Sequence, residues 1–132
     1  MTAGNGLPPP KNVRPFWAHP FAAFAFSMAG LGFLLGQRAA QIQLVFLAIT
    51  VVVFALIGAS LSQWLVMVAL FMACLATEAL NTAIELLVDR VSPEISDFAK
   101  HAKDLGSFAV CCALLIFGGY GLRVVAEIML LR

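Results

Sequence analysis

Residues 39–77, AAQIQLVFLAITVVVFALIGASLSQWLVMVALFMACLAT, decide the fold. These 39 residues include no Asp, Glu, Lys, Arg or His. About 20 apolar residues cross a bilayer core, so the run is too long for one span and long enough for parts of two. Its only cluster of small and polar residues, GASLSQ at 58–63, predicts the break. We therefore expect one membrane helix over about 40–58 and a second over about 62–91.

The composition of the whole chain also indicates an integral membrane protein. Of the 132 residues, 62% are hydrophobic and 11% are charged, whereas ordinary soluble domains are about 25% charged. A surface with so few charges would not stay in water, and so apolar a chain is not intrinsically disordered. Eight Lys and Arg balance seven Asp and Glu, which leaves no basic field for nucleic acid.

The later part of the chain predicts a long second helix and a third span. At 1.5 Å per residue the second helix is about 45 Å long, so its end at Asp89 and Arg90 should project beyond a roughly 30 Å hydrocarbon core. The third span is expected over about 104–128. Glycines at 118, 119 and 121 interrupt it and predict close helix contact or a bend. Arg123 and Glu127 stand four residues apart near its far end and can pair.

The N-terminal part divides into two segments. Residues 1–15 are polar and rich in Gly and Pro, which predicts a disordered tail. Residues 16–36 are apolar and aromatic, and we interpret them as an amphipathic helix in the membrane interface; a fourth span is the competing interpretation. The expected fold class is an all-α integral membrane bundle, with three transmembrane helices, the interfacial helix, and residues 16–132 as one domain.

Basic residues predict the orientation in the membrane. Two groups lie an even number of crossings apart: Lys11, Arg14 and Arg38 before the first span, and Arg90, Lys100 and Lys103 after the second. Because cytoplasmic loops are enriched in Lys and Arg, both groups are expected on the cytoplasmic side.

The acidic residues are concentrated in one region. Six of the seven fall between Glu78 and Asp104. Four polar residues recur at i, i+3, i+7 and i+11 and so share one helix face: Glu78, Asn81, Glu85 and Asp89. Glu78 should lie about 16 Å deeper than Asp89, where a carboxylate costs at least about 2.5 kcal/mol. Such a residue usually faces a cavity, a partner or a metal; the alternative is a neutral Glu hydrogen-bonded to a neighbouring helix.

The loop after the second span adds further candidates. Ser92, Pro93 and Glu94 are typical of a helix start, with Ser92 as N-cap and Pro93 at the first position. Capping alone is the alternative role for Ser92 and Glu94. Lys103 can meet a phosphate or reach lipid headgroups. Asp104 can hold a metal or an amine, or act as a first-turn acid that the helix dipole favours.

Together these groups offer carboxylates for a divalent cation, cations for polyphosphate, and an intramembrane base. This set fits phosphoryl transfer to a lipid alcohol at the interface. The sequence contains neither a GxxxxGK[ST] loop nor the protein-kinase motifs. From the residues alone, the conclusion stops at a small membrane protein with an acidic site near the cytoplasmic face.

Residues 78–94, EALNTAIELLVDRVSPE, followed by AKDLGS at 102–107, resemble the signature of the prokaryotic diacylglycerol kinase family. The family pattern E-x-x-N-[ST]-A-I-E-x-x-V-D matches without a gap, and A-K-D follows at the family's distance. The resemblance implies a homotrimer in the bacterial inner membrane with its site on the cytoplasmic side. The implied reaction uses ATP and Mg²⁺ to phosphorylate diacylglycerol to phosphatidic acid.

The resemblance also implies roles for individual residues. Glu78 matches the general base, and Glu85 matches a carboxylate that binds the metal of MgATP. Positions that match nucleotide contacts are Glu85, Glu94, Ser96, Lys103 and Asp104. Positions that match supporting polar residues are Asn81, Asp89 and Ser107.

One position departs from the family pattern. A second metal-binding Glu of the family, in a pattern like E-R-x-x-x-I, corresponds here to Gln37 in QRAAQI at 37–42. Mg²⁺ prefers carboxylate and water oxygens, so the amide predicts weaker metal binding or a shifted lipid preference. Undecaprenol is the alternative substrate within the family. A non-catalytic membrane assembly or proton-pathway protein is the alternative from another class.

Overall fold

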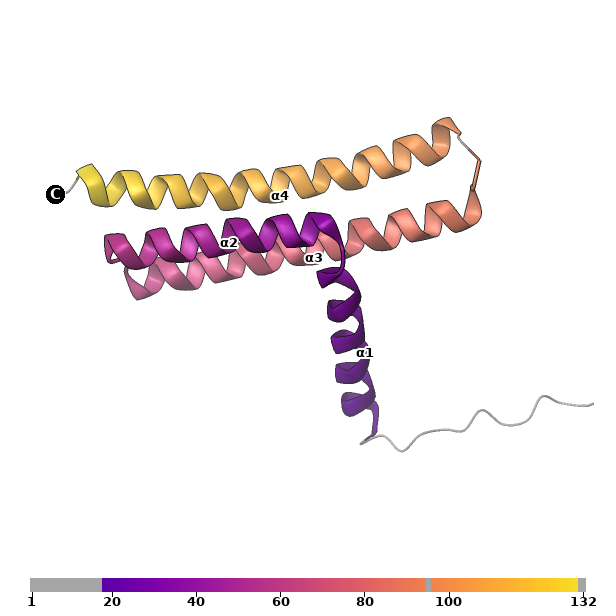
Figure 1. Ribbon diagram of the computed structural model, residues 1–132, viewed down its shortest axis with the longest axis horizontal. Helices are drawn as coiled ribbons and strands as arrows, with labels where there is room; N and C mark the ends of the chain where they lie inside the picture. The colour runs from indigo at the N-terminus through magenta and orange to yellow at the C-terminus, as the bar shows by residue number, and fades with distance from the viewer. Residues whose placement is uncertain (1–17, 95, 131–132) are drawn as a thin grey trace, which may run out of the picture. The chain divides into compact units, whose positions relative to one another are not determined.

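The computed structural model describes residues 18–94 and 96–130. They form four helices, which are α1 (Ala18–Leu35), α2 (Arg38–Ile57), α3 (Leu61–Val91) and α4 (Asp97–Leu130) (Figure 1). The all-α class is confirmed, and α2, α3 and α4 are each long and apolar enough to cross a membrane. The tail predicted over residues 1–15 lies outside the described residues.

The shorter apolar helix α1 falls within the predicted segment 16–36. From Phe21 to Leu35 it carries no charged side chain. Its one hydroxyl in that stretch, on Ser27, donates to the backbone carbonyl of Ala23 at 3.0 Å, which satisfies it within the helix. The location of α1 in the membrane interface stays a prediction, with a fourth span as the alternative.

The turn between α2 and α3 confirms the break expected at 58–63. Gly58 ends α2 with a φ of 73°, a left-handed conformation that glycine adopts without steric penalty. The N–H of Ala59 then donates to the carbonyl of Phe54 at 3.0 Å. Ser60 caps α3, because its hydroxyl accepts from the N–H of Gln63 while the Gln63 side chain accepts from the N–H of Ser60. This reciprocal capping box satisfies two donors that a helix start would leave open.

The link between α3 and α4 differs from the prediction. Ser92 does not begin a helix: it is the C-cap of α3 and donates its N–H to the last turn at 2.8 Å. Pro93 has no N–H and disfavours the helical conformation before it, so it ends α3 instead of starting the next helix. The cap of α4 is Ser96, whose hydroxyl accepts from the N–H of Ala99 at 3.2 Å. Helix α4 therefore begins at Asp97, earlier than the span predicted from about 104.

Helices α3 and α4 run side by side and extend past the start of α2 as a pair (Figure 1). They contain 31 and 34 residues, against 20 in α2. At about 1.5 Å per residue, both are longer than a roughly 30 Å hydrocarbon core. The link at 92–96 therefore joins the two helices at the end where they project furthest.

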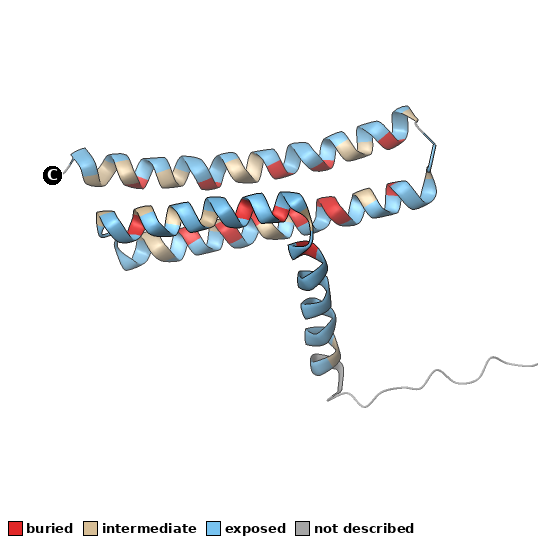
Figure 2. Cartoon of the chain, viewed as in Figure 1, coloured by how far each residue is buried: buried red, intermediate tan, exposed pale blue. Residues whose placement is uncertain are grey.

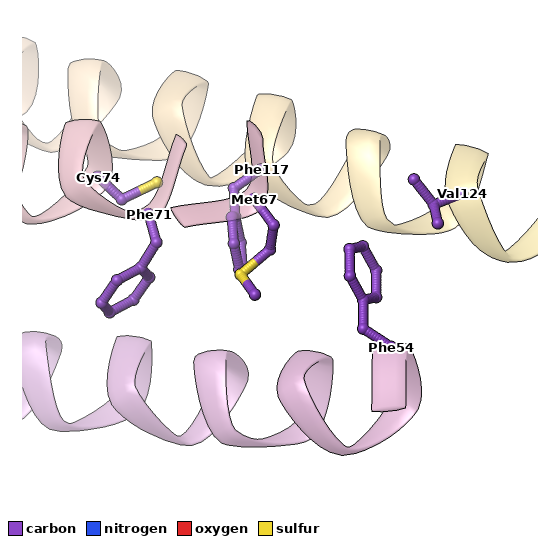
Figure 3. Packing of buried hydrophobic residues seen from close by; sticks show 6 residues of the cluster. All are labelled: Phe54, Met67, Phe71, Cys74, Phe117 and Val124. Carbon is purple, nitrogen blue, oxygen red and sulfur yellow. The ribbon is translucent and has the colours of Figure 1, made fainter. Parts of the chain in front are cut away.

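An apolar core fills the bundle near the Gly58 turn. Its buried members come from all three long helices (Figure 3): Phe54, Met67, Phe71, Cys74, Phe117 and Val124. Phe54 meets Trp64 edge-on with ring centroids 5.6 Å apart, and Phe71 meets Phe117 at 5.8 Å. Such aromatic contacts tie the helices together beyond the area they bury.

Along α3 the buried face changes from apolar to polar. In α3 most successive buried positions are three or four residues apart, and buried segments recur along each of the long helices (Figure 2). In α3 they are Met67, Phe71 and Cys74, followed by Glu78, Asn81 and Thr82, and then Val88. Many large apolar side chains on the outside are exposed, such as Leu56 at 78% and Leu122 at 74%. A surface of this kind suits lipid or neighbouring protein.

Two of the three glycines in α4 make no close helix contact among the described residues. The helix continues unbroken through 118, 119 and 121. Apart from the chain neighbours and the helix's own backbone, no described atom lies within 4 Å of the space that a Cβ on Gly118 or Gly119 would occupy. Gly121 does face α2, since a Cβ there would lie 4.0 Å from Thr50 Cγ2, an ordinary van der Waals distance. The pair predicted near this end is confirmed, since Arg123 and Glu127 approach to 3.3 Å.

Candidate active site

The polar stripe on α3 runs from the core of the bundle to its surface. The exposed fraction is 3% for Glu78 and 7% for Asn81. Glu85 is half-buried, and the side chain of Asp89 is 64% exposed. The exposed fraction of these side chains therefore rises in the order of their positions along the helix.

Glu78 is held from the facing helix. The Gln43 side chain on α2 donates its Nε2 to Glu78 Oε2 at 3.0 Å. Both side chains are almost completely buried, with 2% of Gln43 exposed. Buried polar groups need hydrogen-bond partners, and this contact satisfies one oxygen of the deepest carboxylate. The other end of the amide, Gln43 Oε1, is buried without a partner among the described residues.

Glu85 is held from its own helix. Asn81, one turn earlier, donates its Nδ2 to Glu85 Oε1 at 2.9 Å. The amide oxygen of Asn81 is buried against Gly106 of α4, where a Cβ would overlap it. A larger residue at this position would therefore force the Asn81 side chain to move.

A cavity of about 620 Å³ opens beside these carboxylates. It is lined by all three long helices and by the residues just before α2: Gly36, Gln37, Arg38, Ala39, Glu78, Asn81, Thr82, Glu85, Ser107 and Val110. Gln37 is the N-cap residue of α2, yet its side chain makes no capping hydrogen bond. Its amide is therefore not committed to the helix end. Five of the residues predicted for the site meet in this one cavity.

A second, smaller cavity lies at the α3–α4 link. Its volume is about 200 Å³, and it is lined by Asp89, Ser92, Pro93, Glu94, Ser96, Ala99, Lys100 and Lys103. The Lys103 ammonium pairs with the Asp89 carboxylate across the two helices. The hydroxyls of Ser92 and Ser96 lie 3.0 Å apart. Four more predicted residues, namely Asp89, Glu94, Ser96 and Lys103, therefore meet here.

The predicted residues thus fall into two neighbouring groups. Glu85 lines the first cavity and Asp89 the second, and the two are one helical turn apart on α3, about 6 Å along its axis. Asp104 is exposed and lines neither cavity. The structure therefore does not bring this predicted residue together with the others.

The side chains around the larger cavity determine how Mg²⁺ could be held there. Among the described residues, no three His, Cys, Asp or Glu side chains cluster as a metal site would require. Mg²⁺ is usually bound by one or two carboxylates together with substrate phosphates and water rather than by a closed protein cage. Glu85, with Glu78 and the Gln37 amide around the same cavity, fits a cation that arrives with a polyphosphate.

Sequence reasoning missed Gln43, Thr82 and Gly106. Gln43 is a polar residue inside the uncharged run, three residues after Ala40, and both are buried. Its helical phase could have placed it on the face that meets α3. The contact between Gly106 and Asn81 carries no comparable signal, because it depends on how closely the two helices approach.

Comparison with known proteins relates the sequence of this chain to lipid kinases. The family model described as prokaryotic diacylglycerol kinase matches residues 25–125. A diacylglycerol kinase of Sinorhizobium sp is 46% identical over 107 residues, which cover 81% of this chain and 78% of that protein. A diacylglycerol kinase of Pseudomonas aeruginosa is 39% identical over 95 residues, or 71% of this chain and 77% of that protein. One of Haemophilus influenzae is 36% identical over 62 residues, or 47% and 52% of the two chains.

Proposed function

Because the chain belongs to the prokaryotic diacylglycerol kinase family, we propose that it phosphorylates diacylglycerol to phosphatidic acid with ATP at the membrane interface. The observation that carries this proposal is the meeting of Glu78, Asn81 and Glu85 in one cavity at the polar end of the membrane helices. Membership of a kinase family also removes the support for a non-catalytic assembly or proton-pathway protein.

In the proposed reaction, the primary hydroxyl of the lipid attacks the γ-phosphorus of ATP. A new oxygen–phosphorus bond forms, the bond to the bridging β–γ oxygen breaks, and ADP leaves. The hydroxyl proton passes to the Glu78 carboxylate. Glu78 suits this role because it is a buried base that lines the cavity, where proton transfer does not compete with bulk water.

Glu85 is proposed to hold the metal of MgATP. It lies seven residues further along α3 and closer to the surface than Glu78, so the polyphosphate would approach from the water side. When bound, Mg²⁺ neutralises charge on the phosphate oxygens. Asn81 fixes the Glu85 carboxylate through its 2.9 Å hydrogen bond. Gln37, which lines the same cavity, offers a weaker, neutral ligand.

The smaller cavity is proposed to take the nucleotide. It offers two lysines, Lys100 and Lys103, and the hydroxyl of Ser96. The pair between Lys103 and Asp89 joins side chains that are 39% and 64% exposed, and such surface pairs open at little cost. Lys103 can therefore leave Asp89 to meet a phosphate. Glu94 is a further candidate contact here. Ser107 lines the larger cavity instead, and Asp104 lines neither cavity.

The proposed orientation places both cavities on the cytoplasmic side of a bacterial inner membrane. Arg90, Lys100 and Lys103 surround the link between α3 and α4, and basic residues favour the cytoplasmic face. ATP is present on that side. Assembly as a homotrimer is also proposed, and the apolar side chains exposed on the long helices offer surface for it.

The experiment that tests the proposal measures transfer from γ-labelled ATP to lipid in mixed micelles, with and without Mg²⁺. Diacylglycerol and undecaprenol are supplied in parallel, because both present a primary alcohol at the interface. We expect Mg²⁺-dependent label in phosphatidic acid. Label only in undecaprenyl phosphate would replace the proposed substrate, and no label in either lipid would contradict the proposed activity.

A further inference from the structure

Gln43 is the polar side chain that the proposed reaction leaves unexplained. It lies on α2, 98% buried, in a helix whose other buried residues are Ala40 and Phe54. A Leu or Met would fill the same space without burying an amide, and an unpartnered buried polar atom costs about 1–3 kcal/mol. Gln43 has one such atom, Oε1. Packing alone therefore does not account for a glutamine at this position.

The partner of Gln43 is the proposed base. Its Nε2 donates to Glu78 Oε2 at 3.0 Å, from α2 to α3. One carboxylate oxygen is fixed by this contact, so the rotation of the whole carboxylate is restricted. The second carboxylate oxygen is then the one left for a substrate proton. A base that is held in one orientation transfers protons more efficiently than one that samples several.

The end of the amide that faces Glu78 fits the base at both stages of the reaction. A carboxylate oxygen can only accept, and Gln43 presents its donor, Nε2, to Glu78 Oε2. When the second oxygen of Glu78 takes the proton, Oε2 becomes the carbonyl oxygen of the acid and still accepts from Nε2. The same contact therefore holds Glu78 in one orientation before and after the proton transfer.

We infer that Gln43 is a positioning residue for Glu78, whose carboxyl group it holds in one orientation through its side-chain N–H. The inference rests on the proposed function, in which Glu78 receives the proton of the lipid hydroxyl. Gln43 itself gains and loses no proton. The transferred proton stays on Glu78 until it leaves to water.

The test uses Gln43→Met, which keeps the length and volume of the side chain and removes both polar atoms. Its matched control is Gln41→Met, an exposed glutamine on the same helix whose amide donates to the carbonyl of Leu35. The full chain is assayed in mixed micelles with diacylglycerol and MgATP, and thermal unfolding is recorded for each variant. Gln43→Asn, which keeps the amide but is one methylene too short to reach Glu78, is assayed in the same way.

We expect Gln43→Met and Gln43→Asn each to lower kcat by about tenfold or more, since a hydrogen bond to a charged group is lost. The KM values for ATP and for lipid should stay within about twofold, and Gln41→Met should leave kcat unchanged. A side chain that merely ties two helices together would lower stability without this split between kcat and KM. Full kcat in either Gln43 variant would overturn the inference.

A double-variant cycle tests whether Gln43 acts on turnover through Glu78. The residual turnover of Glu78→Gln, measured over long incubation with labelled ATP, should fall by less than about twofold when Gln43→Met is added, because the base that Gln43 serves is already absent. A further tenfold fall would show that Gln43 acts elsewhere. An inactive wild-type chain would contradict the proposed function itself, whereas an active wild type with a fully active Gln43→Met would contradict only this inference.

Discussion

Replacing Gly106 by alanine puts a methyl group where α3 and α4 touch. A Cβ at this position would overlap Asn81 Oδ1 and lie 3.2 Å from Asn81 Cγ and 3.7 Å from its Cα. Carbon atoms pack best at about 3.5–4.0 Å, so the contact to Cγ is too short even before the overlap with oxygen is considered. Either the Asn81 side chain turns away or the two helices separate.

Each response has a measurable consequence. If Asn81 turns away, its 2.9 Å hydrogen bond to Glu85 is lost, and the carboxylate proposed to hold MgATP becomes free to rotate. If the helices separate, packing between α3 and α4 is lost. Overpacking a well-packed contact typically costs about 1–3 kcal/mol. We expect Gly106→Ala to lower the free energy of unfolding by this amount and to raise the KM for MgATP severalfold.

The matched control is Gly119→Ala on the same helix. Apart from the chain neighbours and the helix's own backbone, no atom of the described residues lies within 4 Å of the space that its Cβ would fill. Only helix propensity therefore changes, which favours alanine by up to about 1 kcal/mol. Unfolding is followed by far-UV circular dichroism in detergent micelles, and KM is taken from the labelled-ATP assay. If the two variants were equally stable and bound MgATP equally well, the close approach at Gly106 would be refuted.

Four further substitutions probe the proposed roles in the same assay. Glu78→Gln should lower kcat by at least about 100-fold, because the amide cannot accept the proton, while the unfolding temperature changes little; substantial turnover would refute the role of the base. Glu85→Gln should raise the KM for MgATP at least as much as Gly106→Ala does, and an unchanged KM would place the metal elsewhere. Lys103→Ala should weaken ATP use but alter stability by less than about 1 kcal/mol, since its pair with Asp89 is exposed; a large loss of stability with normal ATP use would mean that the pair is structural. Gln37→Glu should lower the Mg²⁺ concentration needed for half-maximal activity and raise turnover, and an unchanged Mg²⁺ dependence would show that residue 37 does not contact the metal.

The sequence predicted the long helices well because their signals are local and strong. An uncharged run of 39 residues admits little besides membrane helices, and the turn at Gly58 combines a left-handed glycine with a capping box. The helical spacing of Glu78, Asn81 and Glu85 likewise follows from periodicity alone. These features need no knowledge of what the helix packs against.

The errors come from features that depend on neighbours. Ser92 and Pro93 match the residue preferences of a helix start, but α3 uses the N–H of Ser92 in its own last turn, and Ser96 caps α4. Of the glycines at 118, 119 and 121, only Gly121 lies near another helix among the described residues, with Thr50 Cγ2 at 4.0 Å, and the tightest contact is at Gly106. Glycine alone does not reveal whether another helix lies opposite.

Local sequence patterns also did not predict that the candidate residues would fall into two cavities. The family signature contains both Glu85 and Asp89. In the structure, however, Glu85 lines the larger cavity, whereas Asp89 lines the smaller cavity at the link between α3 and α4. Gln43 belongs to the site because its side chain contacts Glu78, which lies 35 residues later in the sequence. Pairings of that range are set by the packing of α2 on α3 and not by local preference.

The central claim is that a buried carboxylate at the polar end of the bundle takes a proton from a lipid hydroxyl while ATP supplies the phosphoryl group. Its most direct test is the initial rate of label transfer from ATP to diacylglycerol, measured for the wild-type chain and for Glu78→Gln at equal amounts of folded protein. We expect rapid, Mg²⁺-dependent formation of labelled phosphatidic acid by the wild type and near-complete loss of this activity in the variant. Equal rates for the two proteins would contradict it.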